Sequence, residues 1–120
     1  ITVGAYDYTN DSVAFFSGRG FTRLLSAIKP DLVAPGVNII STKSGGGYSS
    51  YTGTSFATPF VSGACALLME WGIVNGNDPY MYSDKIKAFL IRGSRKLSSI
   101  SIYPSKQAGW GALCIRDSFL

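Results

Sequence analysis

The stretch from Tyr51 to Gly63 reads YTGTSFATPFVSG and places a hydroxyl-rich turn directly before an apolar segment. Residues 55–71 are small or apolar on nearly every helical face, with Glu70 as the only charge. This composition predicts a helix that is buried on all sides. The first amides of a helix have no acceptor within it, so they and the helix dipole stabilise nearby negative charge. At this helix end Ser55 would lie beside a partial oxyanion hole, which favours a nucleophilic role.

The alternative role for these hydroxyls is structural, because capping is the commonest use of a hydroxyl at a helix N-terminus. Thr52, Thr54 and Ser55 could each serve as the cap. Pro59 has no N–H to bond the carbonyl of Ser55, so we expect the regular helix to begin a few residues later. An α/β-hydrolase elbow is disfavoured, because GTSFA ends in alanine where that GxSxG motif has glycine.

Short elements are predicted before this helix. Ile1–Asp7 is rich in β-forming residues and predicts a strand, whereas residues 13–25 predict an irregular loop. Asp31–Lys43 predicts two strands broken by a proline-glycine turn. The second of them is expected to return through the glycines at 45–47 as a hairpin that ends near Thr52.

A second helix is predicted to begin near Ser83, with the Ser83 side chain as its N-cap and Asp84 at the positive end of its dipole. Gly93 is expected to end it in the left-handed conformation. Its apolar residues fall at helical spacing, which predicts an amphipathic, peripheral helix. Ala112–Ile115 follows two glycines and predicts a closing strand.

The composition excludes several kinds of chemistry. The chain has 120 residues and no histidine, so a complete Ser-His-Asp or Cys-His site and a histidine zinc site are excluded within it. Hydrophobic residues make up 46%, which suits one globular domain. Cys65 and Cys114 lack the spacing of metal ligands or of a disulfide framework, and we expect both to be small core residues.

Charge and hydropathy give little indication of other partners. The net charge is +4, and the densest basic stretch, Lys85–Lys96, predicts a helix face exposed to solvent. A nucleic-acid partner is not predicted, because Phe89 is the only aromatic residue within this stretch that could stack on a base. No apolar run approaches the roughly 18 residues of a membrane span, so no membrane partner is predicted.

The stretch GTSFATPFVSGACAL resembles the serine-containing signature of the subtilisin-like proteases, GTSxAxPxVxG. Upstream, VAPGVNI, SGRG and ITVGAYD resemble the preceding elements of that family in order, so the resemblance covers most of residues 1–115. It implies an α/β, three-layer subtilisin-like fold with a mostly parallel sheet. With LLMEWGIVNGNDP after it, the signature is similar to short subtilases of clostridia and related anaerobes, including spore-associated germination proteases.

By this resemblance Ser55 is the catalytic nucleophile, its backbone N–H is an oxyanion donor and the Thr54 hydroxyl supports the oxyanion. The triad order Asp, His, Ser in this family places both the base and its orienting acid before the serine. No histidine precedes Ser55, and three early carboxylates match family positions downstream of the triad aspartate: Asp7, Asp11 and Asp31. None of the three is therefore expected to be catalytic.

The oxyanion-hole asparagine of the family is also not matched, since Asn10 and Asn38 lie after its position. Residues 1–120 are accordingly expected to be the C-terminal segment of a subtilisin-like peptidase domain. The N-terminal part of that domain, with the Asp and the His, lies outside them. The expected partners are that missing part and a polypeptide substrate.

The sequence departs from the family signature at two positions, and the role of one carboxylate needs a separate argument. Phe56 and Phe60 replace the methionine and histidine that are frequent in the signature, but neither position is the general base. Asp31 falls near a weak cation site of some relatives. One carboxylate cannot form the oxygen cage of calcium, so no cofactor is predicted and Asp31 is expected to be a turn or strand-edge carboxylate.

The resemblance implies a serine endopeptidase that hydrolyses peptide bonds through an acyl-enzyme on Ser55, with the isolated chain inactive. The alternative is a non-catalytic pseudoprotease or protein-interaction module with a subtilase fold. The sequence itself leaves the location undetermined. The family is typical of secreted, spore-associated or cell-envelope-associated bacterial proteins.

Overall fold

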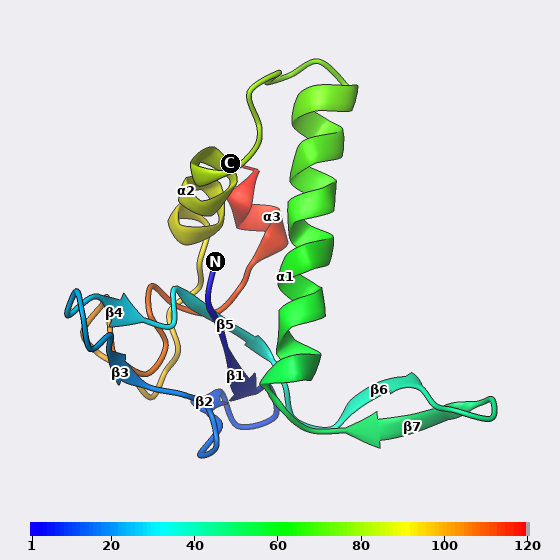
Figure 1. The fold of residues 1–120 in the computed structure, drawn as a ribbon, viewed down its shortest axis with the longest axis vertical. Coiled ribbons are helices and arrows are strands. Elements are labelled where there is room, and N and C mark those ends of the chain that lie inside the picture. Colours follow the sequence, from blue (N-terminus) through cyan, green and yellow to red (C-terminus); the bar gives the residue numbers. More distant parts are fainter. Residues whose placement is uncertain (120) are drawn as a thin grey trace.

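A small sheet forms the centre of the computed structural model, which describes residues 1–119 (Figure 1). Strands β1 (Val3–Asp7) and β5 (Leu32–Pro35) pair in parallel, and β2 (Ser12–Val13) pairs antiparallel to β1, in the order β2-β1-β5. The register places Val3 opposite Leu32. These strands confirm the two β-strand predictions made for their segments.

Two hairpins extend from this sheet. β3 (Gly20–Phe21) pairs with β4 (Ile28–Lys29), and β6 (Ile39–Thr42) pairs with β7 (Tyr48–Tyr51). The β6–β7 hairpin projects away from the body of the molecule (Figure 1). Its return through the glycines at 45–47, which all have positive φ, confirms the predicted turn. The segment 13–25 is irregular over most of its length, as predicted, and contributes only Val13 of β2 and the two residues of β3 to strands.

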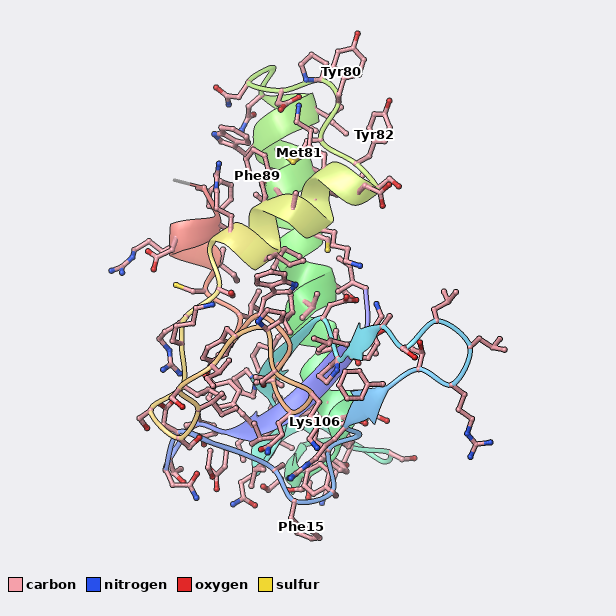
Figure 2. All side chains as sticks on the ribbon, turned by 90° about the vertical axis from the view of Figure 1, so that its left-hand side faces the viewer. Phe15, Tyr80, Met81, Tyr82, Phe89 and Lys106 are labelled. Atoms are coloured by element: carbon pink, nitrogen blue, oxygen red, sulfur yellow. The ribbon has the colours of Figure 1, made fainter. Side chains whose placement is uncertain are left out.

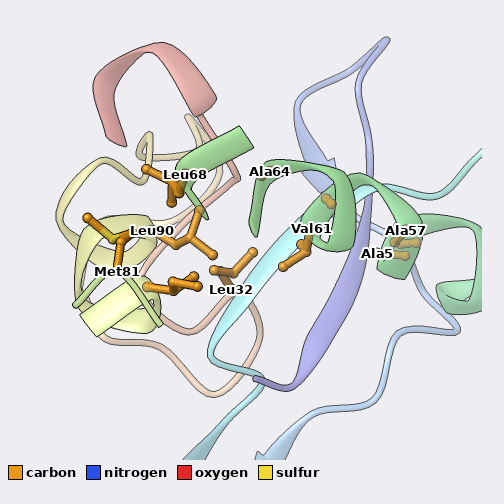
Figure 3. Close-up of a cluster of buried hydrophobic side chains, with 11 residues drawn as sticks. Ala5, Leu32, Ala57, Val61, Ala64, Leu68, Met81 and Leu90 are labelled. Carbon is orange, nitrogen blue, oxygen red and sulfur yellow. The ribbon is translucent and has the colours of Figure 1, made fainter. Parts of the chain in front are cut away.

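The long helix α1 (Thr54–Met69) packs on the sheet and continues into a π-helical turn, η1 (Glu70–Val74). Pro59 lies inside the helix, so the prediction of a later start is wrong. A proline this near the N-terminus removes one hydrogen bond, and the helix continues through it. One apolar face of α1 is buried against β1 and β5 (Figure 3): Ala57, Val61, Ala64 and Leu68.

The prediction that α1 is buried on all sides is wrong for the described residues. Phe60, Leu67 and Met69 are 40%, 45% and 41% exposed. The sheet and α2 (Asp84–Arg92) cover only the face of α1 opposite these three residues. The apolar helix α1 is therefore covered on one side only.

Residues Thr54–Val74 are also long and apolar enough to cross a membrane by length and composition alone. The expectation that no segment reaches that threshold is therefore wrong. A core helix satisfies the same criterion, and in this fold the segment packs on the sheet.

Alternate residues of the central strands face opposite sides, as the two-residue period of a strand requires. Ala5, Leu32 and Ala34 point toward α1, where Met81 and Leu90 complete the same cluster (Figure 3). On the other side of the sheet, the C-terminal segment covers a second cluster: Tyr6, Val33, Leu97, Ala108 and Ala112. The sheet is thus covered on both faces.

Helix α2 confirms the predicted amphipathic helix, with Ile86 and Leu90 buried. The two predicted caps are wrong, because the Ser83 side chain makes no capping hydrogen bond and Gly93 has φ −80°. A β-carbon at Gly93 would collide with the backbone of Ser118. Gly93 is therefore required by close packing of the C-terminal segment and not by a left-handed turn.

The predicted closing strand at Ala112–Ile115 is also wrong. Ala112 makes two isolated bridges, parallel to Val33 and antiparallel to Arg95, and the chain then turns into the short helix α3 (Ile115–Ser118). The half-buried Cys65 packs against the core, and Cys114, also half-buried, lies just before α3. Burial raises the pKa of the Cys65 thiol.

Candidate functional site

A backbone contact between the sheet and the helix fixes where α1 begins. The Gly53 amide donates to the Gly36 carbonyl at 2.8 Å, and the Gly36 amide donates to the Tyr6 carbonyl at 3.1 Å. A β-carbon at Gly36 would lie 2.5 Å from the β-carbon of Ala5 and 2.9 Å from the Gly53 oxygen. Glycine is therefore needed at 36, and α1 starts directly at the carboxyl end of β5.

Ser55 lies in the first turn of this helix with its side chain exposed, and Thr54 beside it is half-buried. No side chain caps the helix, which overturns the capping interpretation of the three hydroxyls. As a first-turn residue Ser55 has no acceptor for its amide within the helix. An exposed hydroxyl and an unpaired amide thus lie together at the positive end of the α1 dipole.

The neighbouring side chains hold the turn before Ser55. The hydroxyl of Thr52 accepts a hydrogen bond from the Asn38 amide at 3.0 Å, so it joins the turn after β5 to the end of β7 and does not cap. The rings of Tyr51 and Phe56 stack with centroids 4.9 Å apart and an interplanar angle of 15°. Phe56, which departs from the subtilase signature, therefore ties the helix start to β7.

Two pockets flank this helix start. One, of about 250 Å³, is lined by Thr54, by residues of β1 and the β3–β4 hairpin, and by Arg19 just before β3. The other, of about 360 Å³, includes Thr52 and Val37 and is otherwise lined by the segment Asp7–Phe16. Phe15 at its rim is 92% exposed and points away from the body (Figure 2). Thr54 and Thr52, close to Ser55 in the chain, each line one of these pockets.

The three early carboxylates are engaged elsewhere. Asp7 accepts hydrogen bonds from the hydroxyl and amide of Thr9, which hold the pKa of Asp7 below its ordinary value. Asp11 accepts from Arg95 at 2.7 Å and from the Ser98 amide at 2.9 Å. These two bonds lower the pKa of Asp11 to about 2. Neither carboxylate titrates near neutral pH, as a general base would have to.

Asp31 has a side chain only 6% exposed, directly before β5. It faces the ammonium groups of Lys29 at 2.8 Å and Lys87 at 3.0 Å, and it accepts from the Thr2 amide at 2.7 Å. Burial alone would raise the pKa of Asp31, but these hydrogen bonds outweigh it and lower the pKa to about 2. The predicted turn carboxylate is confirmed. Within residues 1–119, no group of three metal-ligating side chains could hold a metal ion.

The basic stretch is not simply a face exposed to solvent. Lys85 pairs with Asp78, Lys87 pairs with the buried Asp31, and Arg95 pairs with Asp11. Lys96 donates to the Trp110 carbonyl at 2.7 Å. These cations already have partners within the protein, so they offer little free charge to a polyanion.

Family and structural comparisons identify the family and the fold of this chain. A model of the subtilase family matches residues 1–111, and the chain belongs to that family. It is 38% identical over 116 residues to serine protease AprX of Bacillus subtilis, covering 80% of this chain and 25% of that protein. It is 43% identical over 81 residues to the PII-type proteinase of Lactococcus lactis, covering 67% of this chain and 4% of that protein.

Solved structures give the same result. The CspB protease of Clostridium perfringens superposes with a TM-score of 0.93 at 46% identity, over 99% of this chain and 26% of that one. The patellamide maturation protease PatA superposes with a TM-score of 0.76 at 31% identity, over 98% of this chain and 40% of that one. These matches confirm the α/β subtilisin-like fold and the likeness to a clostridial subtilase. The chain spans well under half the length of each of these proteins.

The sequence signature places Ser55 and Thr54 at the start of α1, but the contacts made by Gly36 and Arg95 are not predictable from it. The sequence indicates only a turn at Gly36, because the close approach of Gly36 to Ala5 and Gly53 depends on tertiary packing. In the sequence Arg95 is one charge of a basic stretch, whereas in the fold it pairs with the distant Asp11. No local pattern marks either role.

Proposed function

We propose that residues 1–120 are the C-terminal segment of a subtilisin-like peptidase domain and that Ser55 is its nucleophile. The observation that carries this proposal is the exposed Ser55 in the first turn of α1, where the helix amides lack acceptors within the helix. Membership of the subtilase family and the partial coverage of every relative described above support it.

In this function the Ser55 hydroxyl attacks the carbonyl carbon of a peptide bond of a polypeptide substrate, and its proton passes to a base outside residues 1–120. The chain has no histidine that could serve as that base. The carbonyl oxygen becomes an oxyanion, which the Ser55 amide and the Thr54 hydroxyl stabilise as hydrogen-bond donors. Loss of the protonated amine leaves an acyl-enzyme, which water hydrolyses to release the acid and restore the serine.

The test uses the full-length protein that contains this chain, with the variants Ser55→Ala and Ser62→Ala. Ser62 is a matched control, because it is an exposed serine on the same helix. A fluorophosphonate probe should label the wild type and Ser62→Ala, with the adduct on Ser55, and should not label Ser55→Ala. Peptide hydrolysis should fall at least about a thousandfold in Ser55→Ala only.

A folded full-length protein that resists the probe and hydrolyses no peptide would contradict this function. That result would favour the pseudoprotease or protein-interaction module. Sequencing upstream of Ile1 for the expected Asp and His gives a second, independent check of the same proposal.

A further inference from the structure

The loop between β1 and β2 forms part of the wall of the 360 Å³ pocket that Thr52 also lines. Asn10, Ser12 and Val13 line that pocket, together with Phe15 and Phe16. Asp11 lies between two of these lining residues but is not part of the lining itself. Its carboxylate is bonded instead to Arg95, on the segment that follows α2.

Asp11 is the principal attachment of this loop to the rest of the molecule. Its two carboxylate oxygens accept from Arg95 Nη2 at 2.7 Å and from the Ser98 amide at 2.9 Å, and its carbonyl accepts from the Ser99 hydroxyl at 3.3 Å. The other side-chain bonds of the loop are local. Thr9 bonds Asp7, and Ser12 bonds Asn10.

The backbone at Asp11 needs such an anchor. Asp11 has φ +55°, a left-handed conformation that is unfavourable for residues other than glycine and is tolerated best by Asn and Asp. The bonds to the carboxylate and carbonyl hold the residue in this conformation. The chain then turns so that Ser12 and Val13 pair with β1 and the two phenylalanines follow at the pocket.

Arg95 is a rigid support for this anchor. Its amide and carbonyl exchange hydrogen bonds of 2.8 Å with Ala112, which in turn bridges to Val33 of the central strand β5. Its guanidinium lies 5.8 Å from the centre of the Tyr6 ring. Arg95 is therefore fixed to the sheet by main-chain bonds, and the loop is fixed to Arg95 by a side-chain pair.

We propose that the Asp11–Arg95 pair is a latch that sets the wall of this pocket and thereby the selectivity for one large apolar side chain of the polypeptide substrate. Arg95 acts as a positioning residue through the loop and does not touch the substrate. The inference rests on the proposed function. The preference for an apolar substrate side chain follows from the side chains that line the pocket, which include Val13, Phe15, Phe16 and Val37.

The first experiment measures hydrogen exchange of the loop amides in the full-length protein. Asp11→Asn keeps the preference for the left-handed conformation but removes the charge, and Arg95→Gln removes the other partner. Each should speed exchange at residues 8–13 about tenfold, with no further gain in the double variant. The control is Arg116→Gln, which breaks an exposed Arg–Asp pair of the same chemistry at α3 and should leave this loop unchanged.

The second experiment measures peptide binding in the Ser55→Ala background, which needs no catalysis. In a series of peptides, a single Phe replaces Gly at successive positions. The variant Phe15→Ala should lower the preference for Phe at one of these positions, and that position is the one that fills the pocket. There, Asp11→Asn and Arg95→Gln should each reduce the Phe-over-Gly affinity ratio about five- to tenfold. A role in stability alone would lower the fraction of active protein and leave this ratio unchanged.

Unchanged exchange in the latch variants, or an unchanged affinity ratio, would overturn the inference. In catalytically active protein the same variants should raise KM for the Phe peptide and leave kcat within about twofold. Failure of the proposed function appears separately, as wild-type protein that binds these peptides but neither reacts with the probe nor cleaves them.

Discussion

At the scale of single residues, Asp31 combines burial with full charge compensation. Its carboxylate contacts two ammonium groups and one backbone amide while its side chain is 6% exposed. The three donors come from before β1, from β4 and from α2. One carboxylate therefore joins three parts of the chain through ion pairs and a hydrogen bond, without a set of metal ligands around it.

This arrangement predicts a pH dependence of stability. The folded-state pKa of Asp31 is about 2, against an ordinary value of 3.8. A depressed folded-state pKa stabilises the protein above the unfolded value, and the stabilisation is lost as pH falls from about 4 to about 2. The difference corresponds to about 2 kcal/mol in the free energy of unfolding.

The measurement is denaturant unfolding of the full-length protein at pH 2 to 7, with Asp31→Asn beside the wild type. The variant should be less stable at pH 7 by about 2 kcal/mol, and the gap should close toward pH 2. A constant gap across this range would show that ionisation of Asp31 is not responsible.

At the scale of elements, the junction between β5 and α1 decides where the serine lies. Gly36 and Gly53 approach each other across a 2.8 Å hydrogen bond that a β-carbon at Gly36 would obstruct. The sheet therefore holds the first turn of the helix at a fixed distance. Placement of Ser55 depends on a glycine that does not belong to the helix.

Gly36→Ala should therefore disturb both stability and reactivity. Overpacking against Ala5 and the Gly53 carbonyl should lower the free energy of unfolding by about 1–3 kcal/mol. Fluorophosphonate labelling of Ser55 should slow because the helix start is displaced. Gly18→Ala is the control, since a β-carbon at Gly18 meets nothing within 4 Å, and labelling at wild-type rate in both variants would contradict the argument.

At the scale of the whole molecule, one face of α1 leaves apolar side chains exposed, among them Phe60, Leu67 and Met69. Phe60, Leu67 and Ile115 line a groove of about 610 Å³ along it. Under the proposed domain assignment, this face packs against the N-terminal part of the same domain. Such an apolar surface favours association when it is left in water.

Residues 1–120 expressed alone should therefore self-associate and show no serine-dependent hydrolysis, because base and orienting acid lie outside them. Sedimentation velocity at increasing concentration measures the first property, and a fluorogenic peptide with Ser55→Ala as control measures the second. Replacing Phe60 and Leu67 by Lys should reduce association. A stable monomer, or hydrolysis that is lost on Ser55→Ala, would contradict the domain assignment.

Local patterns were sufficient to predict the main strands, the glycine hairpin, both long helices and the position of Ser55 and Thr54. These features depend on hydrophobic periodicity, on turn-forming residues and on a contiguous signature. Each of these signals is carried by residues close together in the sequence. Two of the failures have a common cause. The left-handed Gly93 and the closing strand near Ala112 were each replaced by contacts with distant segments.

Tertiary structure alone decided which face of α1 is covered, why residue 36 is glycine and what Arg95 does. Arg95 and Asp11 are 84 residues apart in the chain, yet their side chains meet at 2.7 Å. Packing brings such partners together without leaving a local signal in either segment. The sequence therefore predicted the serine at the start of its helix, whereas the folded chain revealed the contacts that hold that helix start and the Asp11 loop.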